Sequence, residues 1–174
     1  MPDFPDTLRD PIPGILSSDY MAPETRYCGG FSATNSWPTA SKAIFIPFGI
    51  DRPFLATKIS WISQTPSGNA DTGIYDIRGN RLVSNGGFAA AITGAVQPVD
   101  ITDTLLAPGY YFVALVFDNT SAIIRTVTPY AAVMATAGIC EMASAYPLPS
   151  TATLVKVTTN QFPDICIHSK AVGI

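Results

Sequence analysis

Short runs of apolar and β-branched residues, separated by turn sequences, follow one another from about residue 43 onward. Runs of this length bounded by Gly, Pro, Asn and Asp predict β-strands. The expected strands cover 43–48, 54–62, 70–76, 81–84, 96–101, 110–117, 122–128, 153–157 and 165–168. Roughly eight to ten short strands at this spacing predict an antiparallel β-sandwich or barrel.

Two runs are the most informative. In 54–62 the residues alternate, so that Lys58 and Ser60 face one way and Thr57, Ile59 and Trp61 the other. The run 110–117 is apolar on both faces, which predicts a central strand covered on both sides.

Two other stretches predict structure other than strands. Residues 77–80 predict a hairpin turn in which Gly79 and Asn80 take a positive φ. The Ala-rich segment 131–145 fits either one helical turn or a loop.

Residues 1–42 form a different kind of segment. They contain six prolines and the pair Gly29-Gly30, and they sustain no period of 2 or 3.6. Because proline fixes φ and removes a hydrogen-bond donor, we expect an extended, irregular N-terminal arm, followed by a sandwich domain over 43–174. Such an arm either stays mobile or lies across a neighbouring surface.

Composition narrows the classes of protein. Of the 174 residues only 13% are charged and 47% are hydrophobic, which excludes a disordered chain. The net charge of −3 argues against a nucleic-acid partner. Neither a signal peptide nor an uninterrupted apolar span for a membrane is recognisable, so we expect no membrane insertion.

The cysteines indicate no disulfide framework. There are three, Cys28, Cys140 and Cys166, at wide spacings. We interpret them as reduced thiols, consistent with assembly in a reducing cytoplasm, with one bridge plus a free thiol as the alternative.

The middle of the chain resembles a jelly-roll module of bacteriophage virion proteins, such as tail fibres, adhesins, baseplate parts and head fibres or decorations. The resemblance lies in Thr72-Gly-Ile-Tyr-Asp76, followed by Leu105-Leu-Ala-Pro-Gly-Tyr-Tyr-Phe-Val-Ala-Leu115 and by the late Asn160-Gln-Phe-Pro-Asp-Ile165, and it covers about residues 43–170. It implies an antiparallel jelly-roll sandwich, a structural or binding role in a virion, and a homotrimer. It supplies no catalytic residues and no cofactor.

The primary expectation is therefore a non-enzymatic virion component that serves as a head decoration, a head fibre or a part of the tail. The sandwich would associate with its own copies, and the arm would dock onto capsid or tail proteins. A surface poor in Lys and Glu fits partial burial by partners, since interface cores are depleted in these residues. The alternative for this surface is a monomer rich in exposed Ser, Thr and Asn.

A second hypothesis is a receptor-binding adhesin that recognises host surface glycans. Trp37, Trp61, Tyr75, Tyr110 and Tyr111 are the aromatics suited to sugar contact. We expect Trp61, Tyr75 and one of the two adjacent tyrosines to fill the core instead.

Trp37, in the irregular arm, is expected to lie outside the core. Together with Tyr27 and Phe31 it forms the set of candidate docking or glycan contacts.

Catalytic and metal sites are weaker alternatives. Cys140 or Cys166 with His168 and Asp164 would supply a nucleophile, a base and an orienting acid, but a packed cysteine and a strand-end histidine explain the same residues. The acidic residues that would offer oxygen ligands to calcium, or act as turn formers, are Asp71, Asp76, Asp100 and Asp103. We expect neither a metal nor a cofactor, and paired carboxylates of the glycosidase type are the least favoured reading.

Overall fold

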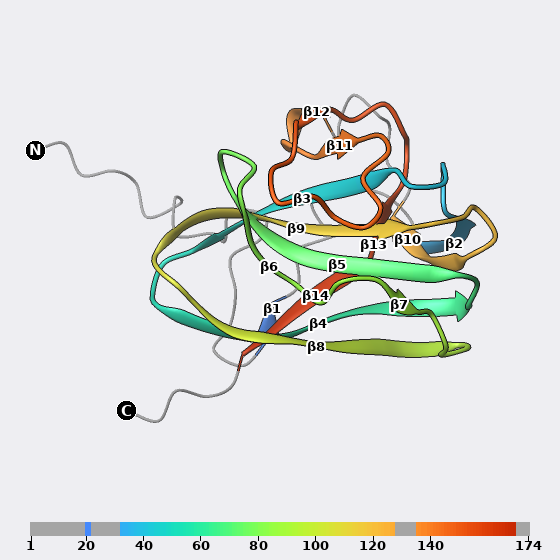
Figure 1. Ribbon diagram of the computed structural model, residues 1–174, viewed down its shortest axis with the longest axis horizontal. Coiled ribbons are helices and arrows are strands. Elements are labelled where there is room, and N and C mark those ends of the chain that lie inside the picture. The colour runs from blue at the N-terminus through green and yellow to red at the C-terminus, as the bar shows by residue number, and fades with distance from the viewer. Residues whose placement is uncertain (1–19, 22–31, 128–134, 170–174) are drawn as a thin grey trace, which may run out of the picture.

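The computed structural model describes residues 20–21, 32–127 and 135–169, which form two antiparallel β-sheets packed together (Figure 1). Sheet A contains β1 (Tyr20–Met21), β2 (Ser32–Ser36), β4 (Phe54–Thr65), β8 (Ala95–Leu106), β10 (Ile123–Val127), β13 (Phe162–Pro163) and β14 (Ile165–Ser169). Sheet B contains β3 (Ala43–Ile50), β5 (Asn69–Asp76), β6 (Arg81–Ser84), β7 (Phe88–Ala89), β9 (Gly109–Phe117), β11 (Cys140–Met142) and β12 (Val155–Lys156). The predicted all-β sandwich is confirmed.

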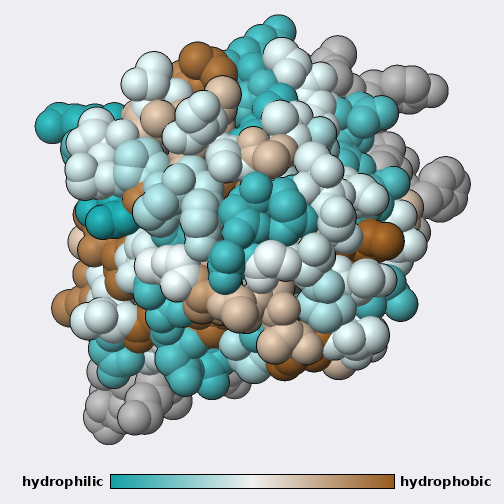
Figure 2. Space-filling view, turned by 45° about the vertical axis from the view of Figure 1, so that its right-hand side comes forward, coloured by the Kyte–Doolittle hydropathy of each residue, from teal (hydrophilic) through white to brown (hydrophobic). Residues whose placement is uncertain are grey.

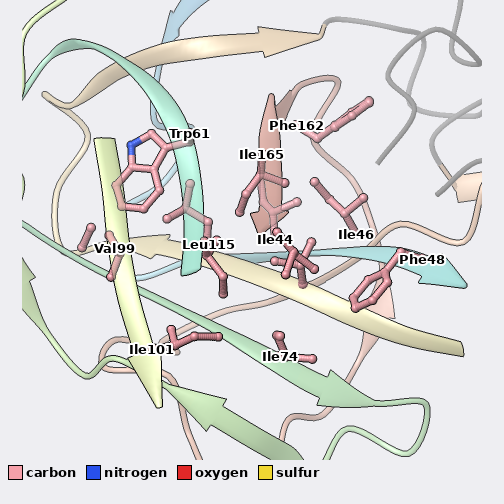
Figure 3. Packing of buried hydrophobic residues seen from close by; sticks show 14 of the residues in the cluster. Ile44, Ile46, Phe48, Trp61, Ile74, Val99, Ile101, Leu115, Phe162 and Ile165 are labelled. Carbon is pink, nitrogen blue, oxygen red and sulfur yellow. The ribbon is translucent and has the colours of Figure 1, made fainter. Parts of the chain in front are cut away.

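The main core lies between the sheets, where the inward-facing residues of each strand meet. Figure 3 shows Trp61, Val99 and Ile101 of sheet A lying among side chains of sheet B. The sheet B residues labelled there are Ile44, Ile46, Phe48, Ile74 and Leu115. Burial of these apolar side chains is the dominant stabilising contribution of a sandwich fold.

Strand β9 is the centre of sheet B, as the apolar run predicted. It pairs with β3 on one side and β5 on the other. Its alternate residues divide between two layers: Val113 and Leu115 belong to the main core, and Ala114 and Val116 to a second hydrophobic cluster on the opposite face. Both faces of β9 are therefore covered from Val113 to Phe117, which explains why no polar alternation appears in this part of its sequence.

The second cluster is closed by a segment that follows β11. We call residues 143–154 the cover segment, because its Ala145, Leu148 and Ala152 are buried against the outer face of sheet B. There they meet Phe45 and Tyr75, whose rings pack edge to face at a centroid distance of 5.2 Å. The chain itself thus covers the part of the outer face of sheet B that Phe45, Tyr75, Ala114 and Val116 form.

Residues 32–42, which the sequence pattern assigned to the irregular arm, contribute to the sandwich. Ser32–Ser36 forms β2, antiparallel to β10. The backbone N–H of Trp37 then donates to the carbonyl of Ala122 at 2.9 Å. Further upstream, β1 pairs antiparallel with β14. The rest of residues 1–31 lies outside the described part.

Local differences from the predicted strands have identifiable causes. The inward positions of Ile59 and Trp61 in β4 are confirmed. A register shift between Ala56 and Lys58 places Ala56, rather than Thr57, in the core. Such a bulge is not visible in an alternating pattern.

In the Ala-rich segment, residues 135–136 are helical and a turn follows, but Cys140–Met142 then forms the unpredicted strand β11 beside β3. The residues 131–134 lie outside the description.

Candidate functional site

Trp37 is not an exposed docking residue. Only 2% of its surface is accessible, and its ring packs against Phe117 at a centroid distance of 5.0 Å. Its indole N–H donates to the carbonyl of Lys42 at 2.9 Å. The expectation that Trp37 lies outside the core was wrong, because β2 carries the ring into the sandwich. Tyr27 and Phe31 lie outside the described residues.

The other aromatics divide as expected between core and surface. Trp61 and Tyr75 are buried, and the hydroxyl of Tyr75 donates to Pro149 of the cover segment at 2.7 Å. Tyr111 stacks on Phe48 at 5.7 Å, whereas 59% of the surface of its neighbour Tyr110 is exposed. Alternation along β9 explains this division, since successive side chains point to opposite faces.

The outer face of sheet A carries the polar residues singled out in the sequence. The registers of β14, β4 and β8 place His168 beside Lys58 and Lys58 beside Asp100. Lys58 Nζ lies 3.1 Å from the carboxylate of Asp100, an exposed ion pair of small energetic value. In the next row Cys166 lies beside Ser60, and His168 Nε2 shares a 2.7 Å hydrogen bond with the Ser60 hydroxyl.

Apolar side chains flank this polar centre at both ends of β8. Val96 is 52% exposed and lies opposite Ile62, and Leu105 is 68% exposed and lies opposite Leu55. Ile62 and Leu55 are themselves only partly buried. The outer face of sheet A therefore presents two apolar pairs separated by an ion pair.

The proposed nucleophile constellation is not assembled. Burial raises the pKa of the Cys166 thiol to about 11, with the charge of Asp164 adding to this effect, so the thiol is protonated at neutral pH. Asp164 lies 3.6 Å from the Nε atom of Arg125, and His168 bonds to Ser60 rather than to a cysteine. Cys140 lies on β11 in the other sheet, and both described cysteines are free.

Burial also lowers the pKa of His168, to which the nearby Lys58 charge contributes. A neutral imidazole beside a 3% exposed serine hydroxyl is a satisfied polar pair in the sheet, without the open approach that an acyl-transfer nucleophile requires.

The four aspartates considered for calcium do not converge. Asp76 accepts hydrogen bonds from the backbone of Arg78 and Asn80 within its own hairpin turn, and Asp100 pairs with Lys58. Asp103 is exposed on β8. Across the described ranges, no group of three or more metal-ligating side chains is present.

Asp71 has a structural position that the sequence did not indicate. It is fully buried, and its carboxylate accepts hydrogen bonds from the Ser84 hydroxyl at 2.8 Å and the Leu148 N–H at 2.9 Å. Arg81 donates to the carbonyl of Leu148. Burial raises the pKa of Asp71, and these hydrogen bonds oppose the shift. The side chains of Asp71 and Arg81 thus hold the cover segment against sheet B.

Comparison with known proteins found no matching family model and no matching curated protein. Within the described residues, no helix is long and apolar enough to span a membrane.

Proposed function

We propose that this chain is a non-enzymatic structural component of a bacteriophage virion, in the head decoration, head fibre or tail, and that it associates with its own copies through the outer face of sheet A. The observation that carries the proposal is the difference between the two outer faces. The cover segment buries part of the outer face of sheet B, where Leu82 and Tyr110 stay exposed, while Val96 and Leu105 are exposed on sheet A.

The jelly-roll topology implied by the family resemblance is part of this proposal. In support, the chain crosses repeatedly between the two sheets. Strands β3, β4 and β5 lie in sheets B, A and B, and strands β8, β9 and β10 lie in sheets A, B and A. Long strands that cross repeatedly between two sheets are the characteristic of such sandwiches.

The surface character also supports burial by partners. The face shown in Figure 2 mixes hydrophilic and weakly polar residues with hydrophobic ones that lie among them. With 13% charged residues in the chain, the repulsive charge that keeps a free domain monomeric is scarce. Three copies packed around sheet A would remove Val96 and Leu105 from water together with the Lys58–Asp100 pair that lies between them.

The experiment is a charge insertion in the proposed contact. We expect Val96→Lys to shift the chain towards the monomer in sedimentation equilibrium, because the contact would bury an unpaired ammonium group. Leu82→Lys is the matched control, since Leu82 is 43% exposed on β6 of sheet B. Equal self-association of both variants and the unmodified chain would reject this face as the contact.

The virion assignment needs its own measurement. Quantitative mass spectrometry of density-purified particles from the source culture should detect the chain at a fixed copy number, a multiple of three for a trimer. Absence of the chain from intact particles would reject the virion role, whatever its state of association.

A second function, glycan binding by an adhesin, is favoured by one observation, the exposed ring of Tyr110 on the central strand of sheet B.

A further inference from the structure

Tyr110 occupies an unusual place for an exposed aromatic residue. It lies near the start of β9, the central strand of sheet B, directly opposite Gly49 of β3. A large side chain at this position would ordinarily be covered by neighbouring side chains, yet 59% of Tyr110 is accessible. The next residue, Tyr111, points inward, stacks on Phe48 and donates its hydroxyl to the carbonyl of Ala107 at 2.8 Å. Because successive side chains of a strand point to opposite faces, Tyr110 points outward.

Gly49 allows the ring of Tyr110 to rest on the sheet. A Cβ atom at Gly49 would lie 3.1 Å from Cε1 and 3.2 Å from Cδ1 of the ring, tighter than ordinary van der Waals contact. The ring therefore lies over the glycine backbone, which leaves its outer side free for another molecule.

The surroundings of Tyr110 are mixed. Ile77, which is 63% exposed, directly follows Asp76, the last residue of β5 to pair with β9. Asp51 and Arg52, both exposed, lie two and three residues after Gly49. The remaining large exposed hydrophobics lie on other strands: Leu82, Val96, Leu105 and Val155.

These features fit a sugar ring better than a protein surface. A protein hot spot needs surrounding apolar contacts that exclude water, whereas the exposed and charged Asp51 and Arg52 follow within three positions of Gly49, the residue paired with Tyr110. A pyranose presents C–H bonds on one face, which pack against the negative face of an aromatic ring, and hydroxyls at its edge, which bond to charged side chains.

We propose that Tyr110, resting on Gly49, is the stacking platform for one pyranose ring of a surface glycan. This inference rests on the second function proposed above, glycan binding. Ile77 would contact the apolar face of the same sugar, and Asp51 and Arg52 would bind its hydroxyls.

The test starts with the unmodified full-length chain on an array of bacterial capsular and lipopolysaccharide oligosaccharides, followed by titration of the strongest binder. We expect Tyr110→Ala to weaken binding about fivefold, because the variant removes the aromatic face on which the sugar stacks. Tyr110→Phe should retain most of the affinity, because the ring remains. Gly49→Ser should weaken binding with the tyrosine still present, because its side chain displaces the ring.

The outcomes separate the two proposals. Array binding that Tyr110→Ala leaves unchanged would overturn the platform while glycan binding stands. No binding by the unmodified chain would reject glycan binding and the platform together. Loss of self-association in Tyr110→Ala, with sugar affinity retained, would identify the ring as a protein contact and also overturn the inference.

Discussion

At the scale of single residues, the hairpin between β5 and β6 shows how one backbone position fixes a distant segment. Gly79 has a φ of +83°, and its carbonyl accepts the N–H of Ala152 at 2.7 Å. A Cβ there would lie 2.4 Å from the carbonyl oxygen of Ala152, a backbone atom that cannot move without displacing the cover segment. Gly79 is therefore required both by the turn and by the close approach of that segment.

We predict that Gly79→Ala destabilises the chain by about 2 kcal/mol or more, since it combines positive-φ strain with a backbone clash. Gly86→Ala is the matched control, because Gly86 has a φ of +75° and nothing within 4 Å of the added Cβ. Urea unfolding of both variants measures the difference. Equal losses would show that Gly79 matters for its φ alone.

Asp71 provides a second prediction at this scale. Because burial raises its pKa above 3.8, the native chain holds the proton more tightly than the unfolded chain does. The contribution of Asp71 to the free energy of unfolding is therefore complete below pH 3.8 and declines as the pH rises through its native pKa. We expect Asp71→Asn to remove this decline, as urea unfolding at a series of pH values will show.

Asp71→Ala should cost about 1–3 kcal/mol at neutral pH, because it leaves the buried N–H of Leu148 without its acceptor. An alanine variant as stable as the unmodified chain would contradict the assigned role of Asp71 in holding the cover segment.

At the scale of elements, the pattern of the sequence predicted the long strands and some short ones, such as β6, but missed several of the shortest. β4 has an alternating pattern and β9 a continuous apolar run, and each is long enough to predict a strand from the sequence. β1, β7 and β13, which were not predicted, each have two residues, and their pairing depends on partners elsewhere in the chain, whereas the equally short β12 lies within the predicted strand 153–157. Local sequence contains no signal for such bridges.

The same limit applies to the candidate residues. Trp37 precedes a proline in a polar stretch, so its burial follows only from the pairing of β2 with β10. Asp71 reads as a turn-forming residue, and its burial depends on a segment more than seventy residues later, where Leu148 donates to it. The exposure of Tyr110 rather than Tyr111 follows from the register of β9, which the sequence left open.

A deletion tests where the sandwich begins. We predict that removal of residues 1–42 abolishes the cooperative thermal unfolding of the chain. The deletion removes β2 and Trp37, and loss of a buried tryptophan side chain alone costs about 3–5 kcal/mol. Cooperative unfolding of the shorter chain at the same temperature would contradict the place of β2 in the fold.

At the scale of the whole molecule, two sheets of similar size have different surroundings. The centre of sheet B is buried on both faces, by sheet A and by the cover segment, while the outer face of sheet A holds exposed Val96 and Leu105 around the Lys58–Asp100 pair. The cover segment packs against sheet B. Association of copies through the outer face of sheet A would bury Val96 and Leu105 in a similar way. In contrast, Tyr110 belongs to sheet B and remains available for a ligand.

Association through sheet A is the central claim, and sedimentation equilibrium of the unmodified full-length chain over a wide range of concentrations tests it most directly. The account predicts a species with three times the chain mass of 18.4 kDa at high concentration, which dissociates on dilution. A single species of 18.4 kDa at every concentration would contradict it.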